Sequence, residues 1–236
     1  MSPYVYARHP AGGLSLAVAG AEVLCRPSGA LWLASERALI VADLHLEKGS
    51  SYAARGQMLP PFDTVDTLTR LEAEAADLAP RLVVLLGDSF HDRAAEGRLS
   101  PSDAGRLTAL ASGRTLIWVL GNHDAEGPRG LPGESLARLT LAGLALVHEP
   151  RAGAARGEVA GHLHPCARVA GNGGSVRRRC FVTDGERLIA PAFGAYAGGL
   201  NIRDAAFTRL LARAPLAGVL GVGRVHAVGW RSLRGD

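Results

Sequence analysis

Residues 82–92 read Leu-Val-Val-Leu-Leu-Gly-Asp-Ser-Phe-His-Asp, and this stretch indicates the architecture of the whole chain. Its first five residues form an unbroken apolar run, which is typical of a β-strand buried on both faces. Because ligands in α/β domains collect beyond the carboxyl ends of the strands, the polar residues that follow are predicted to belong to a functional site. Four other apolar runs end in the same way: Ala38–Ala42 before Asp43 and His45, Thr115–Leu120 before Asn122, His123 and Asp124, Leu144–Val147 before His148, and Glu158–Gly161 before His162 and His164.

Two helices and several shorter strands are predicted around these runs. Val65, Leu68, Leu71, Ala75 and Leu78 recur at helical spacing before Pro80. A second helix is expected over Ser102–Ala111, capped by Ser100 or Ser102. The expected strands are Leu14–Val18, Ala21–Cys25, Leu31–Leu33, the hairpin of Cys180–Thr183 and Leu188–Ala190 around Asp184-Gly185, and Arg224–Val228, after a loose segment at Gly218–Gly223. The pattern predicts one α/β domain over residues 1–236.

Composition narrows the class of protein. The 236 residues are 47% hydrophobic and 20% charged, and no apolar stretch is long enough for a membrane helix. Without a convincing signal peptide, the expected location is the cytoplasm. The net charge is +4, and the basic residues are 25 arginines and Lys48. This charge is compatible with nucleic acid as a partner but does not establish one.

The polar clusters contain ligands for divalent cations. Asp43 and His45, like His162 and His164, are two residues apart, so on an extended strand each pair is expected to face one point. Mixed carboxylate, imidazole and amide ligands suit Mn²⁺, Fe²⁺ or Zn²⁺. Six of the eight histidines fall in these clusters, and burying so many ionisable groups without a metal would be costly. A bridging carboxylate can hold two metals about 3.5–4 Å apart for phosphoryl displacement. Glycines before Asp88, Asn122 and His162 allow close backbone approach.

The ordered blocks Asp-x-His, Gly-Asp, Gly-Asn-His-Asp, His and Gly-His-x-His resemble those of the calcineurin-like metallophosphoesterase superfamily, over about residues 38–165. The resemblance implies a four-layer αββα sandwich with a two-metal site. One metal would be held by Asp43, His45, Asp88 and His164, and the other by Asp88, Asn122, His148 and His162. It also implies in-line attack on phosphorus by a hydroxide that bridges the metals. His123 would protonate the leaving oxygen or stabilise the transition state, and Asp124 would orient a neighbouring group.

Finer resemblances concern the substrate. The Gly-Asp-x-Phe-His block, with His91, is similar to that of SbcD-type DNA repair nucleases, in which a second histidine near the metals assists phosphodiester cleavage. The segment Ala42–Gly49 and the short chain resemble the ligase-associated endonucleases of the PdeM type. These two resemblances imply a manganese-dependent enzyme that acts on DNA, either as an endonuclease or in the processing of DNA ends. They also imply an ATP-dependent DNA ligase and a helicase as partners. Lys48, Arg55 and Arg93 are the candidate phosphate contacts.

Several alternatives remain open from the sequence. A small-molecule phosphatase, a pyrophosphatase or a cyclic-nucleotide phosphodiesterase would need the same metal ligands, and a non-catalytic ligase-binding scaffold would keep the fold. Fe, Zn or Ni could replace Mn²⁺. Neither the oligomeric state nor endo- against exonucleolytic cleavage is decided. Arg177-Arg178-Arg179 is a weak nucleic-acid patch, because in a strand Arg178 faces away from its two neighbours.

Overall fold

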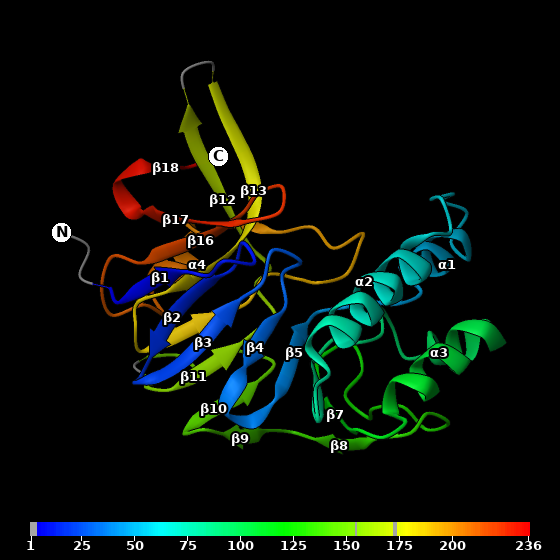
Figure 1. Ribbon diagram of the computed structural model, residues 1–236. Coiled ribbons are helices and arrows are strands. Elements are labelled where there is room, and N and C mark those ends of the chain that lie inside the picture. The colour runs from blue at the N-terminus through cyan, green and yellow to red at the C-terminus, as the bar shows by residue number, and fades with distance from the viewer. Residues whose placement is uncertain (1–3, 154, 172–173) are drawn as a thin grey trace.

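Two β-sheets packed face to face form the core of the computed structural model, which describes residues 4–153, 155–171 and 174–236 (Figure 1). The first sheet has the strand order β1-β2-β3-β4-β5-β6-β7-β8. Its strands are β1 Tyr6–Arg8, β2 Leu14–Val18, β3 Ala21–Cys25, β4 Leu31–Leu33, β5 Ala38–Ala42, β6 Leu82–Leu86, β7 Thr115–Val119 and β8 Glu134–Leu136.

The second sheet is built from the later part of the chain. Its main path runs β15-β12-β13-β14-β11-β10-β9, with β16 and β17 joined through β13 and with β18 joined to β12. The strands are β9 Leu139–Leu141, β10 Leu144–Val147, β11 Glu158–Ala160, β12 Pro165–Gly171, β13 Gly174–Thr183, β14 Arg187–Ile189, β15 Leu200–Asn201, β16 Leu216–Leu220, β17 Val225–Gly229 and β18 Leu233–Arg234.

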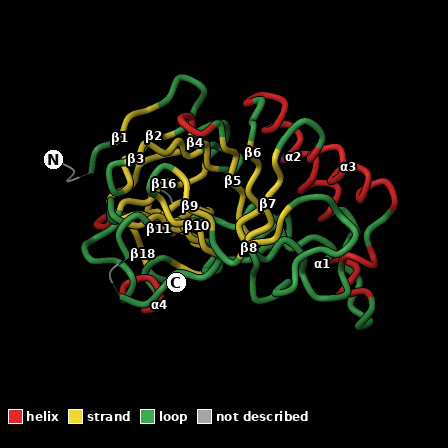
Figure 2. Tube along the Cα trace, turned by 90° about the horizontal axis from the view of Figure 1, so that it is seen from below, coloured by secondary structure: helices red, strands yellow, loops and turns green. Residues whose placement is uncertain are grey.

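Helices cover the outer face of the first sheet near β5, β6 and β7, as Figure 2 shows from below. The covering helices are α2 Asp63–Leu78 and α3 Pro101–Ala111, whereas α1 Lys48–Ala53 lies beyond the strands and contacts α2. Side chains alternate along a strand, so Val83 and Leu85 of β6 pack toward the helices whereas Val84 and Leu86 pack toward the second sheet. The strand is therefore apolar throughout, as a strand buried on both faces must be.

The outer face of the second sheet carries little helix. There, α4 Ala205–Thr208 contributes Phe207 to a cluster that includes Ile202 and Ala217. Two facing sheets with helices outside them form the layered α/β sandwich expected from the sequence, although the second helical layer is thin among the described residues. No helix in the described part of the chain is both long and apolar enough to cross a bilayer.

The predicted strands before the polar clusters are confirmed to within a residue, as are the strands over residues 14–18, 21–25 and 31–33. The strand predicted over Arg224–Val228 is β17, although it is not the last strand, since β18 follows it. The helix predicted to end before Pro80 is α2, and Ser100 caps α3 by accepting a hydrogen bond from Asp103 N at 3.0 Å. One prediction is wrong: Gly218–Gly223 is not loose throughout, because β16 extends to Leu220 and pairs with β13 and β17. The hairpin at Asp184-Gly185 is confirmed, but its first strand, β13, begins at Gly174, well before Cys180.

Candidate metal centre

The five polar clusters meet where β5, β6, β7, β10 and β11 end. Asp43 and His45 follow β5, and Asp88 follows β6 after Gly87. Asn122 follows β7, His148 follows β10 and His162 follows β11, so the parallel strands of both sheets deliver their polar ends to one region. The candidate centre therefore lies across the junction of the two sheets, at their carboxyl edges.

The backbone around these residues is left-handed and not extended. Asp43 has φ 53°, His45 φ 45°, Asp88 φ 45°, His162 φ 68° and His164 φ 45°. Non-glycine residues rarely adopt this conformation, and such conformations gather at functional sites. The expectation that each i, i+2 pair would converge because it lies on an extended strand is therefore wrong, since these residues lie beyond the strand ends. The convergence that does occur comes from the turns.

Glycines allow these turns to pack tightly. A Cβ on Gly87 would lie 2.2 Å from His148 Nδ1, and one on Gly121 would lie 2.2 Å from Asp88 N. A Cβ on Gly161 would lie 2.5 Å from Asp43 Oδ2. Only a residue without a side chain fits at these three positions, which agrees with the close backbone approach expected from the sequence.

One donor group consists of Asp43, His45 and His164, whose nearest ligand atoms all lie within 4.8 Å of one another. His45 Nε2 and His164 Nε2 are 3.2 Å apart, and His164 Nε2 is 3.5 Å from Asp43 Oδ1. Asp43 is fully buried and accepts hydrogen bonds from His162 N at 3.0 and 3.1 Å. These bonds hold the carboxylate in place and tie the turn after β5 to the turn after β11.

A second donor group consists of Asp88, His148 and His162, again within 4.8 Å. Asn122 joins it, because its Oδ1 is 2.8 Å from His148 Nε2 and 3.0 Å from His162 Nδ1. Asp88 Oδ2 is 3.3 Å from His148 Nε2 and 3.9 Å from His45 Nε2, so this carboxylate lies between the two groups. His162 and His164 thus contribute to different groups, whereas Asp88 faces both.

The electrostatics of His45 and Asp88 favour the protonation states that bind metal. The pKa of His148, by contrast, is raised, because the lowering by burial is outweighed by its hydrogen bond with Asp88 and by the charges of Asp43 and Asp88. Burial, reinforced by the positive charge that His164 can carry, lowers the pKa of His45 to about 3, so this imidazole stays neutral. Burial alone would raise the pKa of Asp88, but the hydrogen bond and charge of His148 bring it down to about 2. Neutral imidazoles and ionised carboxylates are the forms that bind metal ions.

The donor set fits two divalent cations. Imidazole nitrogens of different residues face one another at 3.1 and 3.2 Å, and two buried carboxylates lie among them. The buried His45 Nδ1 has no hydrogen-bond partner among the described residues. Convergent lone pairs of nitrogen and oxygen are the environment that a cation satisfies. Asp43, His45, Asp88 and His164 would hold one ion, and Asp88, Asn122, His148 and His162 the other.

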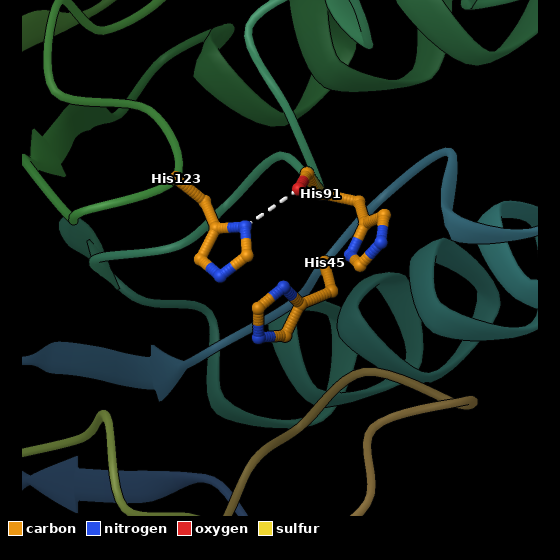
Figure 3. A group of neighbouring side chains, drawn as sticks. All are labelled: His45, His91 and His123. Carbon is orange, nitrogen blue, oxygen red and sulfur yellow. Dashed lines mark hydrogen bonds between the residues drawn. The ribbon is translucent and has the colours of Figure 1, made fainter. Parts of the chain in front are cut away.

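His91 and His123 extend the site on one side (Figure 3). His45, His91 and His123 each place a ring nitrogen within 4.8 Å of the others, and the rings of His91 and His123 stack with centroids 5.6 Å apart. His123 Nδ1 lies 2.7 Å from the carbonyl oxygen of His91, which accepts the Nδ1 proton. This bond leaves His123 Nε2 available for proton transfer, 3.9 Å from Asp88 Oδ2. The buried His91 Nδ1 has no hydrogen-bond partner in the described residues.

Asp124 is placed as a positioning residue. Its carboxylate accepts hydrogen bonds from Ser89 N at 2.7 Å, Phe90 N at 3.2 Å and Gly121 N at 3.0 Å. These bonds join the turn after β6 to the turn after β7 and so orient Asp88 relative to Asn122.

The three candidate phosphate contacts lie in two different parts of the site. Lys48 is half-buried and Arg55 is exposed. Burial lowers the pKa of His91, and the positive charges of Lys48 and Arg55 lower it further, so both residues act on the His91 side of the site. Arg93 instead lines a cavity of about 480 Å³ together with Asp124.

Asp92 was predicted only as the last residue of the second polar cluster, and Arg98 was not singled out from the sequence, although both support this region. Arg98 donates to both carboxylate oxygens of Asp92, at 3.0 and 2.8 Å, and to Ser50 Oγ at 2.9 Å. The start of α1 is thereby connected to the turn that carries His91. Asp92 adjoins His91 in the sequence, which was the available signal. Arg98 belongs to no motif, so nothing in the sequence marked it as the partner of Asp92 and Ser50.

Comparison with known proteins gives a consistent picture. The model of the calcineurin-like phosphoesterase family matches residues 36–185. The crystal structure of nuclease MPE from Pseudomonas putida is similar, with a TM-score of 0.68, 25% identity, and coverage of 95% of this chain and 100% of that one. A phosphoesterase from E. coli, Yfce, aligns at 15% identity and a TM-score of 0.39 over 81% of this chain and 98% of that one. No curated protein matches.

Proposed function

We propose that this chain, which belongs to the calcineurin-like phosphoesterase family and is a metal-dependent phosphoesterase, hydrolyses phosphodiester bonds in DNA. The observation that carries the proposal is the position of His91, whose ring lies beside His45 and His123 at the edge of the donor groups. The similarity to a Pseudomonas putida protein described as a nuclease adds support.

In the proposed mechanism the residues divide the task. Two divalent cations, when bound, would supply an activated water and neutralise charge on the phosphoryl group. Asp88 lies between the two donor groups and sets their spacing. His123, held through Nδ1 by the His91 carbonyl, presents Nε2 to protonate the leaving oxygen. His91 is proposed to contact the second ester oxygen, which a diester has and a monoester lacks.

The finer assignment belongs to the same proposal. We take Mn²⁺ as the native metal, with Fe, Zn or Ni as substitutes, because the donors are oxygen and nitrogen atoms only. The DNA ends would be processed for an ATP-dependent ligase, with a helicase as a further partner, in the cytoplasm. The support for these partners is the resemblance of Ala42–Gly49 to ligase-associated endonucleases.

The test compares diester and monoester hydrolysis. The wild type, Asp88→Asn and His91→Ala are stripped of metal, reloaded with Mn²⁺ and assayed on bis-p-nitrophenyl phosphate, p-nitrophenyl phosphate and labelled DNA. His226→Ala is the matched control, because this exposed histidine lies outside the site on β17. We expect Asp88→Asn to be inactive, and His91→Ala to lose at least about 100-fold on the diester and DNA, the scale of a general acid–base or positioning contribution.

Two outcomes would contradict the proposal. If the wild type hydrolyses only monoesters or small nucleotides, the enzyme is a small-molecule phosphatase with the same donor set. If two metals bind and no phosphoester is hydrolysed, the non-catalytic scaffold is the better description. Metal content measured by mass spectrometry on each variant separates loss of metal from loss of chemistry.

A further inference from the structure

A row of arginines crosses the hairpin formed by β12 and β13, which projects beyond the two sheets (Figure 1). Arg168 of β12 pairs directly with Arg177 of β13 on one side and with Arg234 of β18 on the other. Residues directly opposite in antiparallel strands point to the same face, so these three guanidinium groups share a face. Arg179 lies two residues from Arg177 and belongs to that face as well. We call Arg168, Arg177, Arg179 and Arg234 the arginine face.

This arrangement leaves positive charge uncompensated. Like charges directly opposite each other destabilise a sheet unless something else binds them. Among the described residues, Arg168 and Arg234 have no carboxylate within 4.0 Å, and Arg168 is held by Ser175 Oγ at 2.7 Å. Arg177 is 3.7 Å from Asp236, and both side chains are substantially exposed. Among the described residues, Asp236 is therefore the one carboxylate within 4.0 Å of the four guanidinium groups.

The positive charge continues into a surface cavity. Arg179 donates to the carbonyl oxygens of Ala192, Ala195 and Ala197 and forms no ion pair in the described structure. Together with Arg70 of α2 it lines a cavity of about 420 Å³, which Asp66 also borders. Burial lowers the pKa of Arg70, and the charge of Arg179 lowers it further, as expected for two cations held near each other.

The arginine face is attached directly to the candidate metal centre. β12 begins at Pro165, immediately after His164. At about 3.3 Å per residue along a strand, Arg168 lies on the order of 13 Å from His164, a distance longer than a small diester. The carbonyls that hold Arg179 belong to the segment whose Phe193 N and Gly194 N bind the backbone of Ala42 and Asp43. A polyanion could therefore touch the arginine face and the metal centre at once.

We propose that the arginine face binds the phosphodiester backbone of the DNA strand on one side of the cleaved bond. The inference rests on the proposed function and identifies the substrate as polymeric DNA. Guanidinium forks match phosphate oxygens and carry no base specificity, so this surface positions the strand without reading its sequence. From the sequence alone, Arg177-Arg178-Arg179 was a weak nucleic-acid patch. In the folded chain Arg178 lies on the other face, and the pairing of β12 with β13 and β18 brings Arg168 and Arg234 beside Arg177.

The test uses two triple variants that remove equal charge. R168Q/R177Q/R234Q alters the arginine face. R81Q/R138Q/R178Q is the matched control, because these three side chains are exposed and Arg178 lies on the opposite face of β13. Manganese-loaded proteins are assayed for kcat/KM on a labelled oligonucleotide and on bis-p-nitrophenyl phosphate, over a range of salt concentrations.

We expect the first variant to lose about 10–100-fold on the oligonucleotide and less than about twofold on the small diester. Its log–log salt dependence should become shallower by about 2–3, since each lost phosphate contact contributes about 0.7–0.9 to the slope. The control should stay close to the wild type on both substrates. Equal losses in the two triple variants, or equal losses on the two substrates, would overturn the inference.

A separate measurement keeps the two proposals distinguishable. If the wild type cuts the small diester but no oligonucleotide, the DNA nuclease proposal fails. Binding of the labelled oligonucleotide is then measured by fluorescence anisotropy, with both triple variants built on Asp88→Asn. This measurement tests whether the arginine face binds DNA without depending on DNA cleavage. Weaker binding in R168Q/R177Q/R234Q alone supports the surface, and identical binding in both refutes it.

Discussion

Replacing Gly161 by alanine should disable the metal centre without altering any ligand. The added Cβ would lie 2.5 Å from Asp43 Oδ2, where ordinary contacts begin near 3.4 Å, so one side must move by about 0.9 Å. Asp43 is fully buried, and its carboxylate accepts two hydrogen bonds from His162 N. The movement therefore strains those bonds and displaces a carboxylate of the first donor group.

The magnitude follows from those contacts. Losing a buried hydrogen bond to a charged group costs about 1.5–3 kcal/mol, which in a chain of this size lowers the melting temperature by about 3–12 °C. A misplacement of about 1 Å costs on the order of 100-fold in rate. We therefore expect Gly161→Ala to lose about 100-fold in kcat/KM for bis-p-nitrophenyl phosphate and to bind less metal.

The assay pairs activity with metal content and thermal melting. Gly229→Ala is the matched control, because a Cβ at Gly229 meets no atom within 4 Å and its φ is not positive. If Gly161→Ala keeps its metal and its activity to within about threefold, the close approach of residue 161 to Asp43 has no functional importance, and the placement of Asp43 in the first donor group would have to be abandoned.

Three further predictions concern stability. Gly105→Ala in the exposed face of α3 should raise stability by about 1 kcal/mol, because a helix prefers alanine and the Cβ meets no atom within 4 Å; an unchanged or lower melting temperature would contradict this. For Asp92, burial alone raises the pKa, but bonds from Arg98 and Ser51 bring it to about 2. The folded pKa lies below the ordinary 3.8, so the stabilisation is present above that value and disappears as the pH falls through about 2. Arg98→Gln should therefore cost about 1 kcal/mol at pH 7, after allowing for solvent screening, and its urea midpoint should approach that of the wild type near pH 2; a gap that is independent of pH would be evidence against the ion pair. Finally, chelation should lower the melting temperature by several degrees, because a metal at 100 times its dissociation constant contributes about 2.7 kcal/mol per site. Readdition of Mn²⁺ should restore the melting temperature. An unchanged melting temperature on chelation would argue against a metal held by the turns that carry the candidate ligands.

Local sequence was sufficient for the strands that carry the site. Leu82–Leu86 is apolar throughout because its alternate residues pack against helices on one side and the second sheet on the other. The glycine and polar residues after each run marked the strand end, since apolar packing stops there. Elements whose burial comes from distant partners were harder to foresee. The hairpin strands β12 and β13 have exposed, arginine-rich outer parts without an alternating apolar pattern, so their length could not be predicted.

The candidate ligands and, through the family resemblance, their division between two metals were therefore available from residues 38–165, but the backbone geometry that produces this division was not. Left-handed turns bring Asp43 and His45 into one donor group but send His162 and His164 to different groups, and local spacing does not encode such turns. The arginine face likewise depends on the register of β12 with β13 and β18. Register results from the packing of whole sheets, so only the folded chain places Arg168 beside Arg177 and Arg234.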